Sequence, residues 1–103
     1  MGPTIVRTIA AAAASRKAAH RIIACLCVGA VDGIEIGALS TREVGKDLFT
    51  EENYREVKRH RMNKSLKQCF EMGMRLDGMG KDDVVKSIAA MRDMARVVLR
   101  SAK

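Results

Sequence analysis

Apolar residues recur every three or four positions along most of the chain, which is the spacing of amphipathic helices. The first such segment spans residues 4 to 31. Thr4 is a candidate N-cap, Asp32-Gly33 is a candidate stop, and the length predicts a break near Ser15. We expect the part after Ser15 to be the more deeply buried. Over the whole segment from residue 4 to 31, the apolar residues at near-helical spacing, which we expect to face inward, are Ile5, Ile9, Ala12, Ala13, Ala19, Ile23, Leu26 and Ala30.

The middle of the chain predicts short elements with clear N-terminal signals. Ile34-Glu35-Ile36 alternates between two glycines and is interpreted as an extended linker. The residues from Ser40 to Glu43 match a capping box, in which a hydroxyl and a carboxylate each accept a bond from a free backbone N–H. A helix over 41–48 follows, with Val44 and Leu48 inward.

Two further caps and a last apolar stripe complete the pattern. Thr50 caps a helix that starts with Glu51-Glu52, and Asn63 caps a helix to about Leu76. A turn over 77–80 precedes a last helix that runs from Asp82 to about Arg100. The inner faces are predicted to be Leu66, Cys69, Phe70 and Gly73 in the first of these two helices and Val84, Ile88, Met91, Ala95 and Val98 in the last.

These patterns predict an all-α fold, a compact bundle of five to six short helices with no strand of consequence. At 103 residues the chain is a single helical domain, residues 1–103, in which residues 1–14 are the part expected to fray. Apolar residues make up 48% of the chain and charged residues 30%, as in globular proteins. Only three residues are aromatic, so aliphatic side chains and methionine must fill the core.

The cysteines and the N-terminus indicate a cytoplasmic protein. Three cysteines are an odd number, no secretory pattern accompanies them, and all three are expected to pack as small apolar residues. Cys25 and Cys27 would point about 200° apart on a helix, so they could not share a metal. The Ala-rich start loosely resembles a transit peptide, but basic residues such as Arg7 and Arg16 interrupt any membrane-crossing stretch. We expect no membrane partner.

Charge is concentrated in residues 54 to 67, YREVKRHRMNKSLK, where six basic residues accompany a single acid, Glu56. The chain as a whole has a net charge of +7, and its first acid is Asp32. A solvated helix face explains part of this pattern, because bases after Glu51-Glu52 complement the helix dipole. Excess charge also speeds encounter with acidic partners without identifying them.

A DNA-binding helix-turn-helix is the alternative interpretation, because residues 41 to 60 have the required helix, turn and helix lengths. Phe49, however, occupies the position where the tight turn favours glycine, and Arg55 occupies a usually aliphatic position. The end of the second helix that would meet the major groove is Glu51-Glu52, which phosphates repel. Single-strand binding needs aromatic stacking platforms, and only Tyr54 is near. Nucleic acid is therefore disfavoured as a partner.

The sequence contains no recognisable catalytic pattern. His20 and His60 are 40 positions apart, and we expect their basic neighbours to keep a carboxylate orienter away from either ring. The glycines of LDGMGKDD do not match a phosphate-binding loop. We therefore expect no enzyme, no catalytic residue, no metal and no cofactor.

Protein binding is the remaining class. Seven methionines are present, and several lie near the basic run. Met72 and Met74 are two positions apart on a helix and cannot both face inward, so at least one is expected on the surface, beside Arg and Lys. The predicted partner-binding residues are Arg55, Lys58, Arg59, Arg61, Lys64, Met62, Glu51 and Glu52.

Residues 22 to 79 resemble the small helical immunity proteins of bacterial polymorphic toxins, including those of contact-dependent growth inhibition. The likeness rests on an apolar helix that ends in Asp32-Gly33, on the segment from Ile36 to Phe49, and on a helix that closes with Phe70-Glu71-Met72-Gly73 and Leu76-Asp77. It implies a cytoplasmic, non-enzymatic protein that forms a heterodimer with a cognate toxin domain, such as a tRNA-cleaving nuclease, and occludes its active site.

Two modes of binding are open within this resemblance. The basic run could pair with a cluster of metal-binding carboxylates in a nuclease. Alternatively, Glu43, Asp47, Glu51 and Glu52 could face a basic cleft. We favour the first mode, since a planar guanidinium can bind a carboxylate through two hydrogen bonds.

Overall fold

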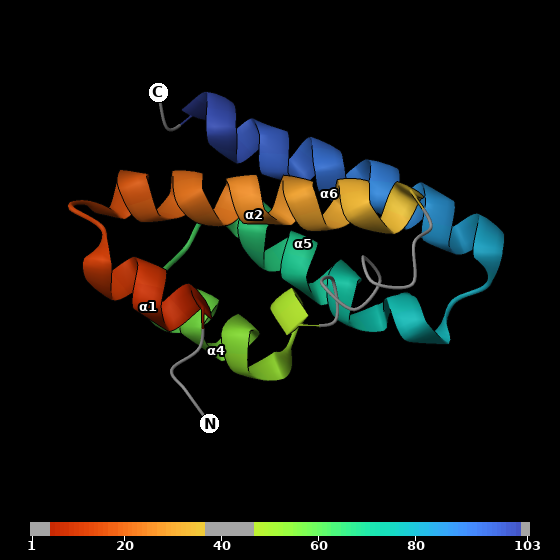
Figure 1. Ribbon diagram of the computed structural model, residues 1–103, viewed down its shortest axis with the longest axis horizontal. Coiled ribbons are helices and arrows are strands. Elements are labelled where there is room, and N and C mark those ends of the chain that lie inside the picture. Colours follow the sequence, from red (N-terminus) through yellow and green to blue (C-terminus); the bar gives the residue numbers. More distant parts are fainter. Residues whose placement is uncertain (1–4, 37–46, 102–103) are drawn as a thin grey trace.

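Two 21-residue helices, α2 (Arg16–Ile36) and α6 (Lys81–Ser101), lie antiparallel against each other and form the upper side of the molecule in Figure 1. The computed structural model describes residues 5–36 and 47–101. The other elements in these ranges are α1 (Ile5–Ala12), α4 (Glu51–Arg59), α5 (Lys64–Arg75) and the 3-10 turn η1 (Leu76–Gly78). The described residues contain no strand, so the all-α prediction is confirmed.

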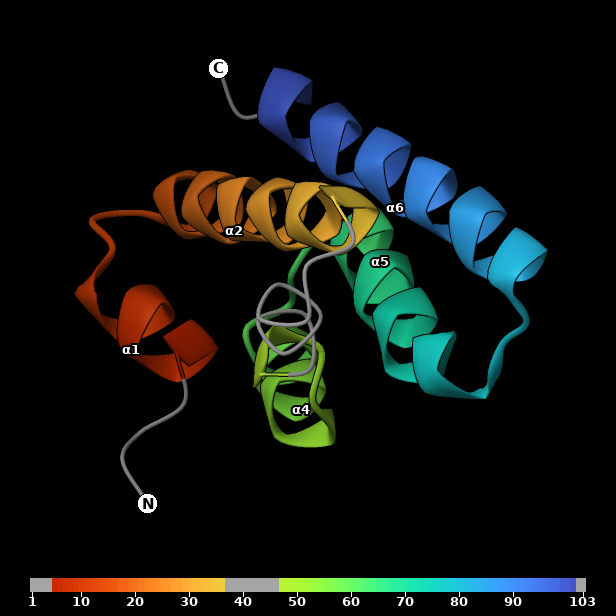
Figure 2. The same ribbon diagram turned by 45° about the vertical axis from the view of Figure 1, so that its right-hand side comes forward.

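The remaining helices lie on the lower side of the α2–α6 pair in Figure 1. Helix α5 packs on both α2 and α6, while α4 packs on α5 and α1 packs on α2 and α4 (Figures 1 and 2). The molecule is flattened, with extents of 38 × 33 × 19 Å. Because α1 packs on α4, the connection between α1 and α2 lies near the connection between α4 and α5.

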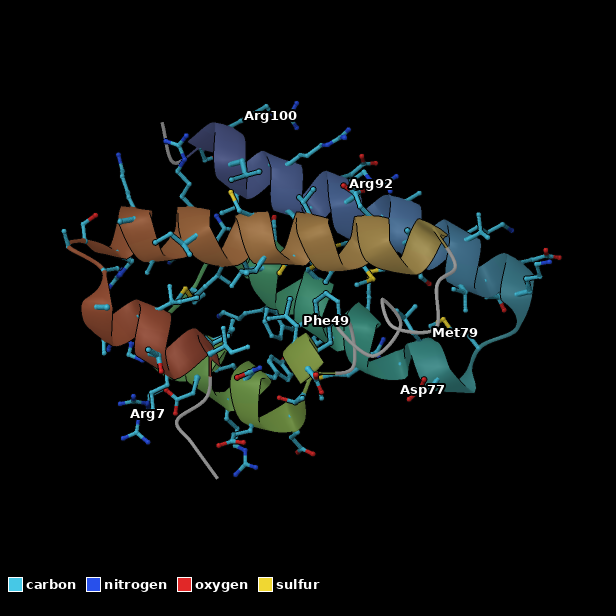
Figure 3. The ribbon with its side chains drawn as sticks, viewed as in Figure 1. Arg7, Phe49, Asp77, Met79, Arg92 and Arg100 are labelled. Atoms are coloured by element: carbon cyan, nitrogen blue, oxygen red, sulfur yellow. The ribbon has the colours of Figure 1, made fainter. Side chains whose placement is uncertain are left out.

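The core lies where α2, α5 and α6 meet. Its largest fully buried side chains include Phe70 and Leu66 of α5, Ile23 of α2 and Met91 of α6. Phe49, which lies in the centre of Figure 3, contacts Phe70 edge-to-face at a centroid distance of 5.4 Å. Such aromatic pairs add about 0.5–1.5 kcal/mol beyond the area they bury.

Most predicted caps and stripes are confirmed. The Thr50 hydroxyl accepts a bond from the N–H of Asn53 at 3.1 Å, and Asn63 Oδ1 accepts one from the N–H of Ser65 at 2.7 Å. Helix α6 begins one residue earlier than predicted, at Lys81. The inner positions of α5 and α6 are buried as expected, except that Gly73 and Val84 are half-buried.

The N-terminal helices depart from the prediction in three ways. Leu26, predicted to face inward, is 37% exposed. The break near Ser15 is present, but the inner face of α1 is shifted by one residue: Val6 is fully buried and Ile5 is 49% exposed. Asp32-Gly33 does not stop α2, which continues to Ile36 and makes Ile34–Ile36 helical. A glycine inside a helix costs only about 1 kcal/mol. The Asp32 carboxylate pairs with Arg92 of α6 at 2.9 Å, which holds this end of α2 on its neighbour.

Two of the three cysteines are packed as predicted, and one is not. Cys27 and Cys69 are fully buried, whereas Cys25 is exposed. Since residues two apart on a helix face opposite ways, only one of Cys25 and Cys27 could enter the core. Contact with Cys69 and burial raise the pKa of the Cys27 thiol well above its usual value, so it stays protonated and packs as an apolar group.

The predictions for residues 40–48 and for the methionines of α5 can be compared with the structure only in part. The predicted capping box and Val44 lie outside the described residues, but Asp47 and Leu48 are helical and Leu48 is buried. Met72 and Met74 are both half-buried, so neither is fully exposed as expected. Among the described residues, no helix combines the length and apolar character needed to cross a membrane.

Candidate binding surface

Helix α4 separates its charges by sign along one outward stripe. Its inner positions, Asn53 and Val57, are buried, while Arg55 and the charged residues near both ends are exposed. Glu51 and Glu52 lie in the first turn and Lys58 and Arg59 in the last turn. Nine helical residues span about 12 Å, so the acidic and basic ends are well separated. The two binding modes left open by the sequence therefore correspond to two different places on α4.

The end of α4 is a left-handed turn with an arginine where glycine is usual. Arg61 has φ of 53°, and its N–H donates to the Lys58 carbonyl at 3.0 Å. The N–H of Met62 donates to the Val57 carbonyl at 3.0 Å. These two bonds define a Schellman motif in which Arg61 is the C′ residue. A residue with a Cβ in this conformation costs about 1–2 kcal/mol relative to glycine.

Met62, a predicted partner-binding residue, is almost completely buried. Its side chain is only 3% exposed, so it offers little surface to a partner. The reason is local: the Schellman motif places the residue after the C′ position against the last inward turn of the helix, where Val57 is also buried. Met62 therefore anchors the turn and fixes the position of Arg61 beside it.

A hollow of about 440 Å³ lies between the α1–α2 connection and the α4–α5 connection. Its lining is apolar at the positions of alanine and Met62 and polar elsewhere, with three arginines. The α4–α5 connection contributes Arg59, His60, Arg61 and Met62, and the N-terminal helices contribute Ala10, Ala13, Ser15, Arg16 and Ala19. None of these nine lining residues is acidic. Three arginines that are up to 45 positions apart in sequence thus share one hollow.

The hollow is open because three of its lining residues are alanines with small side chains. Ala10 of α1 and Ala13 just after it are partly buried against the core, and Ala19 is buried at the start of α2. Each ends at Cβ, so the two backbones leave space that larger side chains would fill. Ser15 is already engaged, because its hydroxyl accepts a bond from the N–H of Ala18 at 3.1 Å. The polar groups left to meet a ligand are chiefly the arginine guanidinium groups.

Glu56 forms a charged cluster at the rim of the hollow. Its Oε2 accepts bonds from Arg59 at 2.9 Å and lies 3.3 Å from Nε2 of His60. The hydrogen bond from Arg59, followed by the charges of Arg59, Arg7 and His60, lowers the pKa of the Glu56 carboxyl. Arg7 projects from α1 toward the α4 side of the molecule (Figure 3). Glu56 thus partly neutralises Arg59 and is within electrostatic range of Arg7 on α1.

The expectation that neither histidine would find a carboxylate is wrong for His60. Glu56 and His60 are four residues apart, so the helix places them on the same face. His20 differs: its Nε2 is buried with no hydrogen-bond partner among the described residues. Burial, and secondarily the charge of Arg16, lower the pKa of His20. The neutral ring is therefore favoured at this position.

The other predicted basic residues do not line the hollow. Arg55, Lys58 and Lys64 are exposed. The Lys58 ammonium lies 4.7 Å from the centre of the Tyr54 ring, and the Tyr54 hydroxyl donates to the Glu71 carboxylate of α5. The first contact lies within α4, and the second joins α4 to α5. Tyr54 thus has a cation over its ring and a carboxylate at its hydroxyl.

The chemical capacity of this surface is anion binding. Positive charge from two connections converges on an apolar floor, which suits an anionic group on a partly apolar carrier. No group of three or more His, Cys, Asp or Glu residues with a metal-binding arrangement occurs in residues 5–36 and 47–101. Comparisons with protein-family models, curated proteins and solved structures find no match to this chain.

Three of the nine lining residues, Arg59, Arg61 and Met62, were predicted from the sequence. Sequence reasoning selected Arg59 and Arg61 because they lie in a dense basic run, and it predicted the break near Ser15. It missed Arg16 and the alanine floor. The one available signal was the absence of acids before Asp32, which leaves the whole N-terminal pair of helices positive. Nothing in the spacing indicated which other connection this region would meet.

Proposed function

We propose that this protein is an immunity protein that binds a cognate toxin domain and occludes its active site. The observation that supports it best is the convergence of Arg16, Arg59 and Arg61 on one hollow. A guanidinium can bind a carboxylate through two parallel hydrogen bonds, and such pairs are stronger than neutral ones. Arginine clusters of this kind are common at the energetic centres of protein interfaces.

The proposed toxin is a nuclease, such as one that cleaves tRNA. This part rests on the resemblance of residues 22 to 79 to immunity proteins of contact-dependent growth inhibition. Many nucleases hold metal ions with clustered carboxylates, and the hollow offers complementary charge to such a cluster. The protein would act in the cytoplasm as one half of a heterodimer. The acidic end of α4, Glu51 and Glu52, would lie at the edge of that interface.

The charge pattern favours a protein partner over nucleic acid. The first turn of α4 exposes Glu51 and Glu52, which would repel phosphates if this helix entered a groove. Phe49 is buried against Phe70, so the segment before α4 belongs to the core of this domain. Tyr54 is engaged by Lys58 and Glu71, which leaves it poorly placed to stack on a base.

The experiment is co-expression with the secreted or surface toxin encoded beside this gene. We expect the two proteins to co-purify as a heterodimer and the toxin domain to lose its nuclease activity when bound. A double charge reversal, Arg16→Glu with Arg61→Glu, should weaken the complex at least about a hundredfold, since buried interface charge pairs cost about 2–5 kcal/mol when broken. The matched control is a double charge reversal at the exposed start of α6, Lys81→Glu with Lys86→Glu, which lies away from α1 and α4 (Figure 1). Reversal of Glu51 and Glu52 to Lys tests the acidic end of α4 separately.

Three results would overturn the proposal or its geometry. No complex with the neighbouring toxin, together with salt-sensitive and sequence-specific binding to duplex DNA, would favour the helix-turn-helix alternative. Loss of binding in the Glu51 and Glu52 variant alone would move the interface to the acidic end of α4. Full retention of binding in the arginine variant would exclude the hollow.

A further inference from the structure

Arg61 occupies a backbone position that glycine would fill with less strain. Its φ of 53° lies in the left-handed region, where a Cβ approaches the following carbonyl. The two Schellman hydrogen bonds use only backbone atoms, and the apolar contact that accompanies the motif comes from Met62 and Val57. The side chain of Arg61 therefore contributes nothing to the turn itself. Residues kept in such strained conformations are concentrated at functional sites.

The Arg61 side chain is exposed and lines the hollow. It pairs with no carboxylate in the part of the chain that the structure describes. Arg59, in contrast, is held by Glu56 through bonds of 2.9 Å and 3.2 Å. Arg61 and Arg16 thus bring positive charge to the hollow from two different parts of the chain, and Arg61 does so at the expense of backbone strain.

We propose that Arg61, which shares the hollow with Arg16, is the anchoring residue of a receptor for one carboxylate side chain, Asp or Glu, of a protein partner. The floor of Ala10, Ala13 and Ala19 would contact the aliphatic stem of that side chain. Glu56, which is held 2.9 Å from Arg59, offsets the charge of that arginine, so the charge left on Arg61 and Arg16 suits a single carboxylate better than a chain of phosphates. The inference rests on the proposed function only for the identity of the partner.

The first experiment separates the side chain of Arg61 from its backbone. In Arg61→Gly the strain is relieved, so the midpoint of thermal unfolding should rise by about 4 °C. In the same variant, binding of glutarate, a small dicarboxylate used as the probe, should weaken at least about tenfold. Arg61→Lys keeps the charge but loses the planar fork, so its binding should fall between the two. Lys86→Ala removes one exposed charge from the first half of α6, which lies away from α1 (Figure 2), and is the matched control.

The probes are glutarate, which mimics a glutamate side chain, and inorganic phosphate. Both are titrated into isotope-labelled protein, and the backbone amide signals are followed by NMR. We expect glutarate to shift signals in residues 15–19 and 59–62 in the wild type and in Lys86→Ala, and to shift them far less in Arg61→Gly. Tighter binding of phosphate than of glutarate at these residues would overturn the choice of a carboxylate ligand.

Two further outcomes decide the rest. Equal glutarate affinity in Arg61→Gly and Lys86→Ala would overturn the role of Arg61, and a lower unfolding midpoint in Arg61→Gly would overturn the argument from strain. Failure of the proposed function looks different: glutarate would bind the hollow while no toxin domain is captured. Conversely, if Arg61→Gly binds the toxin domain with the same affinity as the wild type, the proposed function stands and the proposed role of Arg61 is wrong.

Discussion

The Phe49 ring lies directly against the backbone of Gly73, so that a Cβ built on Gly73 would overlap the ring carbons. Phe49 also contacts Phe70, one turn earlier on α5. The absence of a side chain at Gly73 is what lets the segment before α4 reach the core. This contact positions the start of α4 and, through it, the basic turn at its other end.

Gly73→Ala should destabilise the protein by about 1–3 kcal/mol. Overpacking at the Phe49 ring outweighs the roughly 1 kcal/mol that alanine gains over glycine in a helix. Denaturant unfolding measures the change. Gly29→Ala is the matched control, because Gly29 lies in α2 with nothing within 4 Å of an added Cβ. That variant should instead stabilise the protein by about 0.5–1 kcal/mol, and destabilisation of equal size in both would refute the contact.

Asn53→Ala should destabilise the fold by about 1–3 kcal/mol, because buried carbonyl groups would lose their donor. The Asn53 amide donates to the Leu48 carbonyl at 2.9 Å and to the Asp47 carbonyl at 3.3 Å, and the residue is only 3% exposed. Asn53→Asp should be worse, since a carboxylate would face these oxygens. Thermal unfolding tests both, and an aspartate variant as stable as the wild type would contradict the assigned amide orientation.

The stabilisation that the Glu56 carboxylate gives the fold should be lost in acid. Its pKa is lowered in the folded state, chiefly by the bond from Arg59, so the carboxylate stabilises the fold above its usual pKa of 4.5. This stabilisation is lost as the pH falls below that value, because protonation weakens the pairing. The unfolding free energy of Glu56→Gln should depend less on pH below about 4.5 than that of the wild type. Parallel curves for the two proteins would exclude the contribution.

His20 should add a second pH dependence nearer neutrality. Burial and Arg16 lower its pKa below 6.5 in the folded state, so the unfolded chain takes up a proton first. The protein should therefore lose stability as the pH falls through 6.5, and this loss should be absent from His20→Gln. Unfolding curves between pH 8 and pH 5 test it. His60, which faces Glu56, is unchanged in the comparison, so a persistent slope in His20→Gln would assign the effect elsewhere.

The local features of this fold could be predicted from the sequence because they depend on neighbours within one or two turns. Thr50 and Asn63 cap helices through bonds to the next two or three residues, and the stripe from Ile88 to Val98 follows from helical periodicity. The same reasoning failed at Asp32-Gly33. There Arg92, 60 positions later in the chain, engages Asp32 and supports a helix that a local rule would end.

The sequence by itself determined the all-α class, the caps and the abundance of positive charge, since propensity, periodicity and net charge are properties of short segments or of composition. Only the tertiary structure decided that Arg16 and Arg61 share a hollow, that Met62 is buried and that Cys25 is not. Those outcomes depend on which faces of distant helices meet. The packing of α1 on α4 sets that pairing, and no spacing within either helix encodes it.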